Sequence, residues 1–252
     1  GTSIVELETE LAKHKQYLPF EPPVLGGKGT VGGMVATAMA GPRRPWSGAV
    51  RDFILGVKII NGRGELLRFG GQVMKNVAGY DVSRLMVGAM GCLGVLTEVS
   101  IKVLPEPEVT AFYKLDATLF DFLASCQHWR ADMTPVTGVS FSNGCAYIRL
   151  EGSGATVDDF ARTQNLGVDT GGEQFWHDLR HQGGAFFKRP EALWRLSVPR
   201  ETGLDELGMP MVMDWSGAQY WLKSNDALAV QRLARSHSGH VYAYHADASL
   251  LK

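Results

Sequence analysis

The chain has 252 residues, of which 45% are hydrophobic and 20% are charged. This balance excludes a disordered chain and allows one large domain or two ordinary ones. The formal net charge of −1 gives no reason to expect a nucleic-acid partner or an anionic membrane surface. Glycine accounts for 30 of the 252 residues, a share well above the usual ~7%. Most of these glycines fall in the first hundred residues, so their placement needs a reason.

The sequence shows no segment built for a membrane or for secretion. The longest nearly apolar run, residues 85–96, is too short to cross a bilayer, and no charged-then-apolar leader opens the chain. We therefore expect a cytoplasmic protein that meets a membrane only through a complex. Cys92, Cys126 and Cys145 lie far apart without a CxxC pair, which fits a reducing compartment and excludes a cysteine-held iron–sulfur cluster in this chain.

The first half begins with a helix signal. Ser3 and Glu6 have capping-box spacing, and the apolar face that follows predicts a helix that ends near Lys15. Apolar runs, caps and turn residues then predict further elements: a loop over 26–33, a short helix over 34–40, a strand over 53–60, a hairpin turn at 61–64, a return strand over 65–69, a helix over 82–87 capped by Asp81, and a strand over 95–104.

Pro105 and Pro107 mark the expected domain boundary. Beyond them the same signals predict a helix around 119–126, strands over 139–141 and 146–150 joined by a turn at 142–144, a helix over 158–166, strands over 193–198, 211–215 and 219–222, a helix over 228–236 and a strand over 241–244. This order of elements predicts an antiparallel sheet with its helices on one face.

One stretch of the glycine-rich region is misleading. Residues 27–32 match the GxGxxG pattern, and Asp52 lies where a Rossmann fold places its acidic residue. The proline-rich approach over 19–23 cannot form the central strand that this fingerprint needs, so a nicotinamide-dinucleotide site is disfavoured.

A better interpretation starts at Thr30. Gly32 and Gly33 place two amides without side chains just before a short helix, where a diphosphate can approach the backbone closely. Ala36 and its small neighbours keep that helix slim enough for a flat cofactor to lie against it. The alternative is a tight loop in which glycine serves only positive φ.

Three further segments carry turn or binding signals. Residues 41–48 hold Arg43 and Arg44 between prolines, where they suit either a phosphate or carboxylate partner or a solvated loop. Residues 75–81 suit plain turn chemistry. Residues 88–95 place three glycines before a strand, which indicates close approach by a ligand or by another backbone segment.

In this order the segments resemble the FAD-binding domain of the vanillyl-alcohol oxidase and PCMH-type flavoprotein superfamily. The segments that carry the resemblance are Thr30-Val31-Gly32-Gly33, Gly41-Pro42-Arg43 and residues 51–56, 75–81 and 88–98. The last two are similar to those of members that oxidise 2-hydroxy acids. The segments that resemble the E subunits of bacterial glycolate oxidases are 41–48, 69–76, 175–176, 193–195 and 214–218.

The resemblance implies an α+β protein. It implies a PCMH-type FAD-binding domain over 1–107, incomplete at its N-terminus, followed by a smaller α+β cap domain with an antiparallel sheet over 108–252. We expect the domain to be incomplete because the family's other diphosphate-binding loop precedes the segments found here. The implied cofactor is FAD. Its implied contacts are the backbone of Thr30, Gly32 and Gly33 at the diphosphate, Ala36 and Gly48 along the cofactor, Gly94 and Val95 on the other flank, and Pro23 at its edge.

The resemblance also implies a function. The chain would be the FAD-binding subunit of a glycolate or D-lactate oxidising complex, with a flavin-containing catalytic subunit and an iron–sulfur subunit as partners. In such chemistry a hydride passes from the α-carbon to the flavin, a base takes the hydroxyl proton and an arginine holds the carboxylate. Candidate residues are Arg195, His240 and His245, although each also suits a structural role.

Two points remain open in the sequence. The histidines near the C-terminus lack the Gly-Asp-Gly-Asn motif of related catalytic subunits, so we expect no metal site. The rival function is a non-catalytic scaffold or assembly subunit of the same complex. In that case the FAD site would be vestigial or incomplete, and residues 43–46 would form a docking loop.

Overall fold

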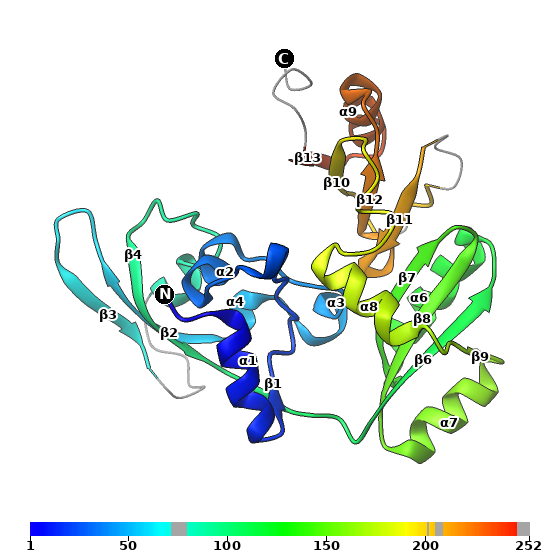
Figure 1. Cartoon of the computed structure of the whole chain (residues 1–252), viewed down its shortest axis with the longest axis horizontal. Coiled ribbons are helices and arrows are strands. Elements are labelled where there is room, and N and C mark those ends of the chain that lie inside the picture. The colour runs from blue at the N-terminus through cyan, green and yellow to red at the C-terminus, as the bar shows by residue number, and fades with distance from the viewer. Residues whose placement is uncertain (72–79, 201, 205–208, 246–252) are drawn as a thin grey trace. The chain divides into compact units, whose positions relative to one another are not determined.

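The computed structural model describes residues 1–71, 80–200, 202–204 and 209–245, and Figure 1 labels their elements where there is room. The chain divides into two compact units, Gly1–Glu106 and Pro107–Lys252. Residues 75–79 of the turn-like segment singled out in the sequence, and residues 72–76 of another, lie outside the described residues. Within the described part, no helix combines the length and the apolar character that a membrane span requires.

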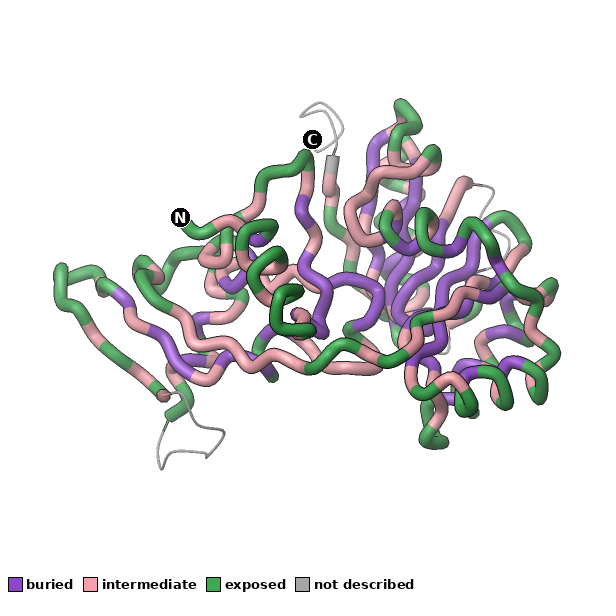
Figure 2. The backbone as a smooth tube through the Cα atoms, turned by 60° about the horizontal axis from the view of Figure 1, so that its bottom comes forward, coloured by how far each residue is buried: buried purple, intermediate pink, exposed green. Residues whose placement is uncertain are grey.

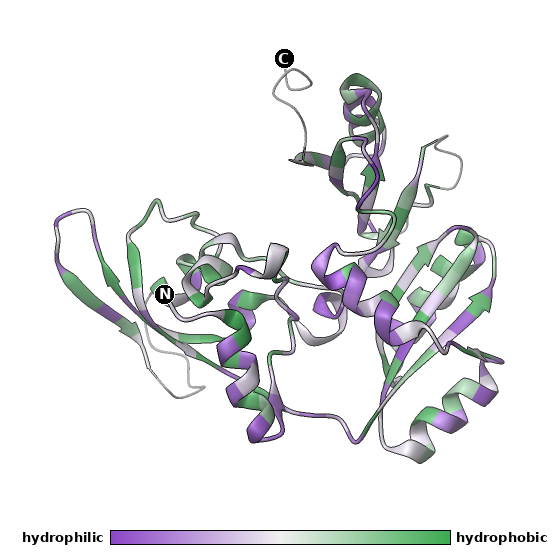
Figure 3. Ribbon diagram, in the orientation of Figure 1, coloured by the Kyte–Doolittle hydropathy of each residue, from purple (hydrophilic) through white to green (hydrophobic). Residues whose placement is uncertain are grey.

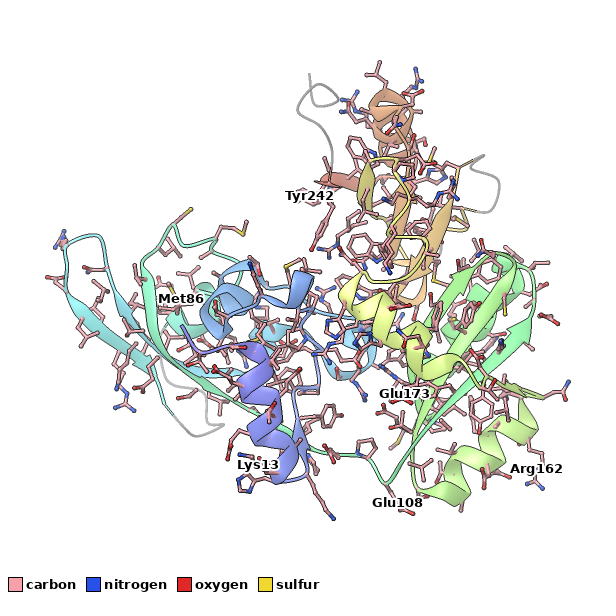
Figure 4. All side chains as sticks on the ribbon, in the orientation of Figure 1. Lys13, Met86, Glu108, Arg162, Glu173 and Tyr242 are labelled. Carbon is pink, nitrogen blue, oxygen red and sulfur yellow. The ribbon has the colours of Figure 1, made fainter. Side chains whose placement is uncertain are left out.

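The first unit mixes short helices with a small sheet. Its elements are α1 (Ile4–Lys13), β1 (Gln16–Tyr17), the 3-10 turn η1 (Leu25–Gly27), α2 (Val31–Thr37), α3 (Arg44–Ser47), α4 (Val50–Phe53), β2 (Ile54–Ile60), β3 (Leu66–Gly70), α5 (Val82–Leu85), β4 (Val95–Ile101) and β5 (Leu104–Pro105). The capping box is confirmed: Ser3 accepts from the Val5 amide, and Glu6 accepts from the Ser3 amide at 3.0 Å. Lys13, labelled in Figure 4, closes α1 two residues earlier than expected.

The main sheet of the first unit has three antiparallel strands in the order β3-β2-β4. The predicted hairpin is confirmed, since the amides of Arg63 and Glu65 both donate to the side-chain oxygen of Asn61. The predicted strand over 53–60 begins one residue too early, because Phe53 ends α4. Asp81 caps α5 as expected, through the amide of Arg84 at 3.0 Å.

The second unit is built on one large sheet. Its elements are β6 (Val109–Asp116), α6 (Leu119–Ala131), β7 (Val136–Ser142), β8 (Cys145–Gly152), α7 (Gly154–Thr163), β9 (Gly167–Val168), α8 (Gly172–His181), β10 (Leu193–Ser197), β11 (Met211–Asp214), the 3-10 turn η2 (Trp215–Gly217), β12 (Gln219–Lys223), α9 (Ala227–Ser236) and β13 (His240–His245). The strand order is β13-β10-β12-β11-β7-β8-β6-β9, and every pairing is antiparallel. The antiparallel sheet expected from the sequence is confirmed.

Helices cover both faces of this sheet, which corrects the expectation of a single helical face. On one face Phe122 of α6 packs against Phe141 of β7, with ring centroids 6.2 Å apart. On the other face Phe175 of α8 stacks on Tyr147 of β8 at 3.8 Å. Phe141 pairs with Ala146 and so shares its face of the sheet, whereas the next residue, Tyr147, points to the other face; the two helices therefore lie on opposite sides.

Helix α8 was not expected at all. Only Gly172, Trp176 and Leu179 of its ten residues are buried, because most of the rest are charged or polar. Figure 2 shows the general pattern, in which burial concentrates on strands while helices alternate between buried and exposed residues. Figure 3 shows the same alternation in hydropathy on α7, whose buried residues are Val157 and Ala161.

Candidate functional site

The first candidate element is the start of α2. The helix was expected from residue 34, but it begins at Val31, because the Thr30 hydroxyl accepts from the Gly33 amide at 3.1 Å and caps it. The Val31 amide donates to the Thr2 carbonyl at 2.9 Å. Gly32 and Gly33 therefore lie in the first turn rather than before it. Within the described part of the chain, no group accepts a hydrogen bond from the Gly32 amide.

A cavity of about 490 Å³ lies beside this turn. Gly32 lines it, and its other walls are formed by the chain's first residues, by leucines of and after α1, by Val31 and by residues of β4 and just beyond. A Cβ added at Gly32 would meet no atom within 4 Å, so open space adjoins the unpaired amide. This combination fits a phosphate-bearing cofactor, which needs a backbone donor that it can reach without a side chain in the way.

Two of the glycine-rich segments predicted as cofactor contacts lie side by side. The amides of Gly88 and Met90 donate to the carbonyls of Val35 and Ala36, at 2.9 and 2.8 Å. The segment that leads from α5 into β4 therefore lies against the end of α2. Apolar side chains are unusually exposed along this segment, namely Leu85, Met90, Leu93 and Val95. Several exposed apolar residues within one short segment suit a surface that a ligand or partner covers.

At two other predicted contact positions, the backbone conformation and a close neighbour within the fold already require glycine. Gly94 has φ +143°, and a Cβ there would lie 2.6 Å from the Ile60 carbonyl oxygen. Gly48 has φ +110°, and its Cβ would lie 3.2 Å from Asp52 Oδ2. The glycines before β4 indicated close approach either by a ligand or by another backbone segment. At Gly94 the close neighbour is the backbone of Ile60. Pro23 is half-buried and contributes no donor.

The arginine loop is partly inside the fold, contrary to both readings of the sequence. Arg43 is 7% exposed, and its Nε lies 3.6 Å from Glu21 Oε1. Its guanidinium carbon also lies 4.9 Å from the centre of the Tyr17 ring. Arg44 is exposed and Trp46 half-buried. A docking surface made of residues 43–46 therefore lacks the Arg43 side chain.

The second candidate element surrounds Arg195 on β10. Its Nε donates to Gln219 Oε1 at 2.6 Å, and its guanidinium carbon lies 4.9 Å from the centre of the Trp215 ring. Burial lowers the pKa of Arg195, opposed by the charges of Tyr244 and Asp214. In the described part of the structure, no carboxylate forms an ion pair with this guanidinium. A partly buried cation without an anionic partner is a candidate for binding one.

The sheet register brings His240 to the same face as Arg195. Ser197 pairs with His240, and Arg195 pairs with Tyr242, so alternate residues of the two strands share one side. His240 is exposed, and Tyr242, labelled in Figure 4, is 64% exposed. The backbone of His245 pairs with Leu193, but its side chain is outside the described part. Across the residues that the structure describes, no three His, Cys, Asp or Glu side chains form a group that suits a metal ion.

Several residues of this second element were missed by sequence reasoning. Gln219, Asp214 and Tyr242 gather around Arg195 from three different strands. In the sequence, segment 214–218 carries only a family resemblance, and no spacing connects it with Arg195. Only the pairing of β10 with β12 and β13 places these side chains together.

Comparisons with known proteins agree with this picture. Residues 1–70 match the FAD binding domain family model FAD_binding_4. The chain is 46% identical over 247 residues to the glycolate oxidase subunit GlcE of Escherichia coli (strain K12), a match that covers 98% of the chain and 70% of the relative. It is 40% identical over 79 residues to the glycolate oxidase subunit GlcD of Bacillus subtilis (strain 168), covering 31% and 17%.

The similarity extends to another relative and to a solved structure. The mitochondrial D-lactate dehydrogenase [cytochrome] of Arabidopsis thaliana is 31% identical over 113 residues, covering 44% of the chain and 19% of the relative. A structure of alkyldihydroxyacetonephosphate synthase superposes with a TM-score of 0.65 at 16% identity, covering 94% of the chain and 58% of that protein. At this identity the structure supports the fold alone.

These findings confirm the predicted PCMH-type fold, the predicted cofactor, FAD, and the assignment to an oxidoreductase complex. The match to GlcE runs through both units rather than the FAD-binding segments alone. The chain belongs to the family of the glycolate oxidase subunit GlcE.

Proposed function

We propose that this chain is the FAD-binding subunit of a complex that oxidises glycolate or D-lactate to the 2-oxo acid. The observation that carries the proposal is the open Gly32 amide beside the cavity at the start of α2. This is the position where the family's ordered glycine segments require an approachable backbone. In this proposal residues 1–107 form the FAD-binding domain and residues 108–252 form the cap domain.

The proposed cofactor contacts differ in which hydrogen-bonding group each residue can offer to the cofactor. Among the described residues the Gly32 amide is an unused donor, whereas the Gly33 amide already donates to the Thr30 hydroxyl. The hydroxyl proton of Thr30 remains for an acceptor. The other proposed contacts are made by backbone or apolar surface at Pro23, Ala36, Gly48, Gly94 and Val95. When bound, FAD supplies the acceptor for the two electrons of the oxidation.

The chain's own contribution to substrate handling is proposed at Arg195 and His240. The guanidinium of Arg195 would hold the substrate carboxylate, because its Nη groups have no anionic partner within the described residues. His240 lies on the same sheet face and is exposed, so its imidazole would take the hydroxyl proton. His245 stays a second candidate for this role, on the sequence alone.

The partners follow from the family and from the cysteines. GlcE is named as a subunit, so this chain belongs in a multi-subunit complex. We propose a flavin-containing catalytic subunit and an iron–sulfur subunit as the other members. In this structure Cys92 is exposed, Cys126 is buried and Cys145 is intermediate, and all three are free. A cluster that carries electrons onward would therefore take its cysteines from outside these residues, and we propose the iron–sulfur subunit as their source.

Two measurements test the proposal. The purified full chain should carry flavin at close to one equivalent by its visible absorbance, and the reconstituted complex should reduce a dye with glycolate. Arg195→Ala should raise KM for glycolate about tenfold or more, the loss expected for one charge-assisted pair. Absence of flavin, together with complex assembly that depends on Trp46, would favour the scaffold function instead.

A further inference from the structure

A row of polar side chains lies behind Arg195. Arg195 Nε donates to Gln219 Oε1 at 2.6 Å, and Gln219 Nε2 donates to Asp214 Oδ2 at 3.3 Å. The other oxygen of Asp214 accepts from the Trp215 amide at 2.8 Å. Gln219 and Asp214 are each 2% exposed, so water does not substitute for these contacts. The row runs from a buried carboxylate, through a neutral amide, to a partly exposed guanidinium.

The chemistry of the three groups fixes the direction of the amide. A guanidinium only donates, and an ionised carboxylate only accepts. Gln219 must therefore turn its oxygen toward Arg195 and its nitrogen toward Asp214, and the opposite orientation would lose both bonds. Asp214 thereby sets the orientation of Gln219, and Gln219 in turn holds one edge of the guanidinium.

The neutral amide also preserves the charge of Arg195. A glutamate at position 219 would place a carboxylate directly against Arg195 Nε, whereas the nearby carboxylate of Asp214 acts on Arg195 only from behind the amide. With glutamine, Nε is occupied and the Nη groups keep their positive charge for another partner. The Trp215 ring supports the guanidinium from its face, and Trp215 itself has φ +53°, an uncommon backbone state for a bulky residue.

We propose that Gln219 and Asp214 are positioning residues that keep Arg195 oriented, and without a direct ion pair among the described residues, for the carboxylate of a small 2-hydroxy acid. Tyr242, paired with Arg195 in the register and 64% exposed, lies on the same face of the sheet. This inference rests on the proposed function for its substrate class. The row of contacts itself does not depend on flavin or on the partner subunits.

The test is glycolate binding to the full chain by calorimetry, without turnover. Gln219→Glu should weaken glycolate binding about tenfold or more, because the new carboxylate occupies the guanidinium. Its melting temperature should fall, because the substitution removes the donor to Asp214 Oδ2 and places a second buried carboxylate beside it. Asp214→Asn should weaken binding by a smaller factor, because an asparagine no longer forces the amide direction. Gln231→Glu, on the exposed side of α9, is the matched control and should bind like the parent.

A spectroscopic and a chemical readout separate positioning from simple structural damage. Glycolate should perturb the fluorescence of Trp215 and protect Arg195 from phenylglyoxal in the parent, and both effects should fade in Gln219→Glu. Glycolamide, which lacks the charge, should do neither. Equal glycolate affinity in the parent, Gln219→Glu and Asp214→Asn would overturn the inference. If those three proteins bound glycolate equally and only Arg195→Ala abolished binding, the proposed role of Arg195 would stand and the positioning role of Gln219 and Asp214 would fail.

Discussion

The backbone amide of Arg43 donates to the carboxylate of Glu21 at 2.9 Å, and the guanidinium of the same arginine returns to that carboxylate at 3.6 Å. Both side chains are buried, and Gly41 lies so close that an added Cβ would sit 2.5 Å from the Glu21 carbonyl oxygen. The loop is therefore fastened to the proline-rich segment before α2. An arginine that looked available to a partner instead holds the first unit together.

Removal of this arginine should destabilise the protein. Arg43→Ala leaves the Glu21 carboxylate buried without its cation, so we expect a loss of about 3–5 kcal/mol in the free energy of unfolding. Urea unfolding monitored by circular dichroism measures it. Arg44→Ala is the neighbouring control, and as an exposed side chain it should change stability by no more than about 0.5 kcal/mol. Equal effects of the two substitutions would contradict the buried pair.

Gly32→Ala should separate cofactor binding from folding. The added methyl group meets no atom within 4 Å, and alanine favours a helix over glycine by up to about 1 kcal/mol, so stability should stay level or rise. Affinity for FAD should fall about tenfold or more, because the methyl group stands before the open amide. Gly62→Ala, in the hairpin turn and equally free of neighbours, controls for the substitution itself. Unchanged flavin titration of Gly32→Ala would remove this amide from the site.

Gly94→Ala should instead damage the fold. Its Cβ would lie 2.6 Å from the Ile60 carbonyl oxygen at φ +143°, so β2 and β4 must separate locally, at a cost of about 2 kcal/mol or more. Gly91→Ala isolates the conformational part, since Gly91 has φ +78° with no atom within 4 Å and should cost about 1 kcal/mol. Thermal melts of the apoprotein compare the two. A smaller loss for Gly94→Ala than for Gly91→Ala would show that the strands yield easily.

Cys126 should make stability fall at alkaline pH. Burial raises its pKa from 9.0 to about 12. Below pH 9 the thiol is neutral in the folded and the unfolded chain, so it adds no pH dependence. Between pH 9 and 12 only the unfolded thiol ionises, which favours unfolding by up to about 1.4 kcal/mol per pH unit.

Urea titrations at several pH values measure this slope, and Cys126→Ala should remove it. At pH 8 iodoacetamide should modify the exposed Cys92 and leave Cys126 intact, with the sites identified by mass spectrometry. Early modification of Cys126 in the folded chain would contradict its burial.

The sequence predicted those elements that local chemistry decides. The capping box at Ser3, the turn at Asn61 and the cap at Asp81 each depend on residues within four positions of one another, and all three are present. The start of α2 was misplaced by three residues, because two glycines suggested a loop while the Thr30 hydroxyl caps the helix before them. Helix α8 was missed because its packing face is narrow and its other residues are polar.

The sequence by itself determined the family and the cofactor, because the glycine segments must keep their order and identity where a cofactor approaches the backbone. It also determined most strands and helices through short-range patterns. Only the tertiary structure decided which polar residues act together. The neighbours of Arg195 come from strands whose pairing depends on burial across the whole sheet, and Arg43 meets a carboxylate 22 positions away. No local pattern encodes such contacts, because each arises from the packing of segments that the chain brings together only on folding.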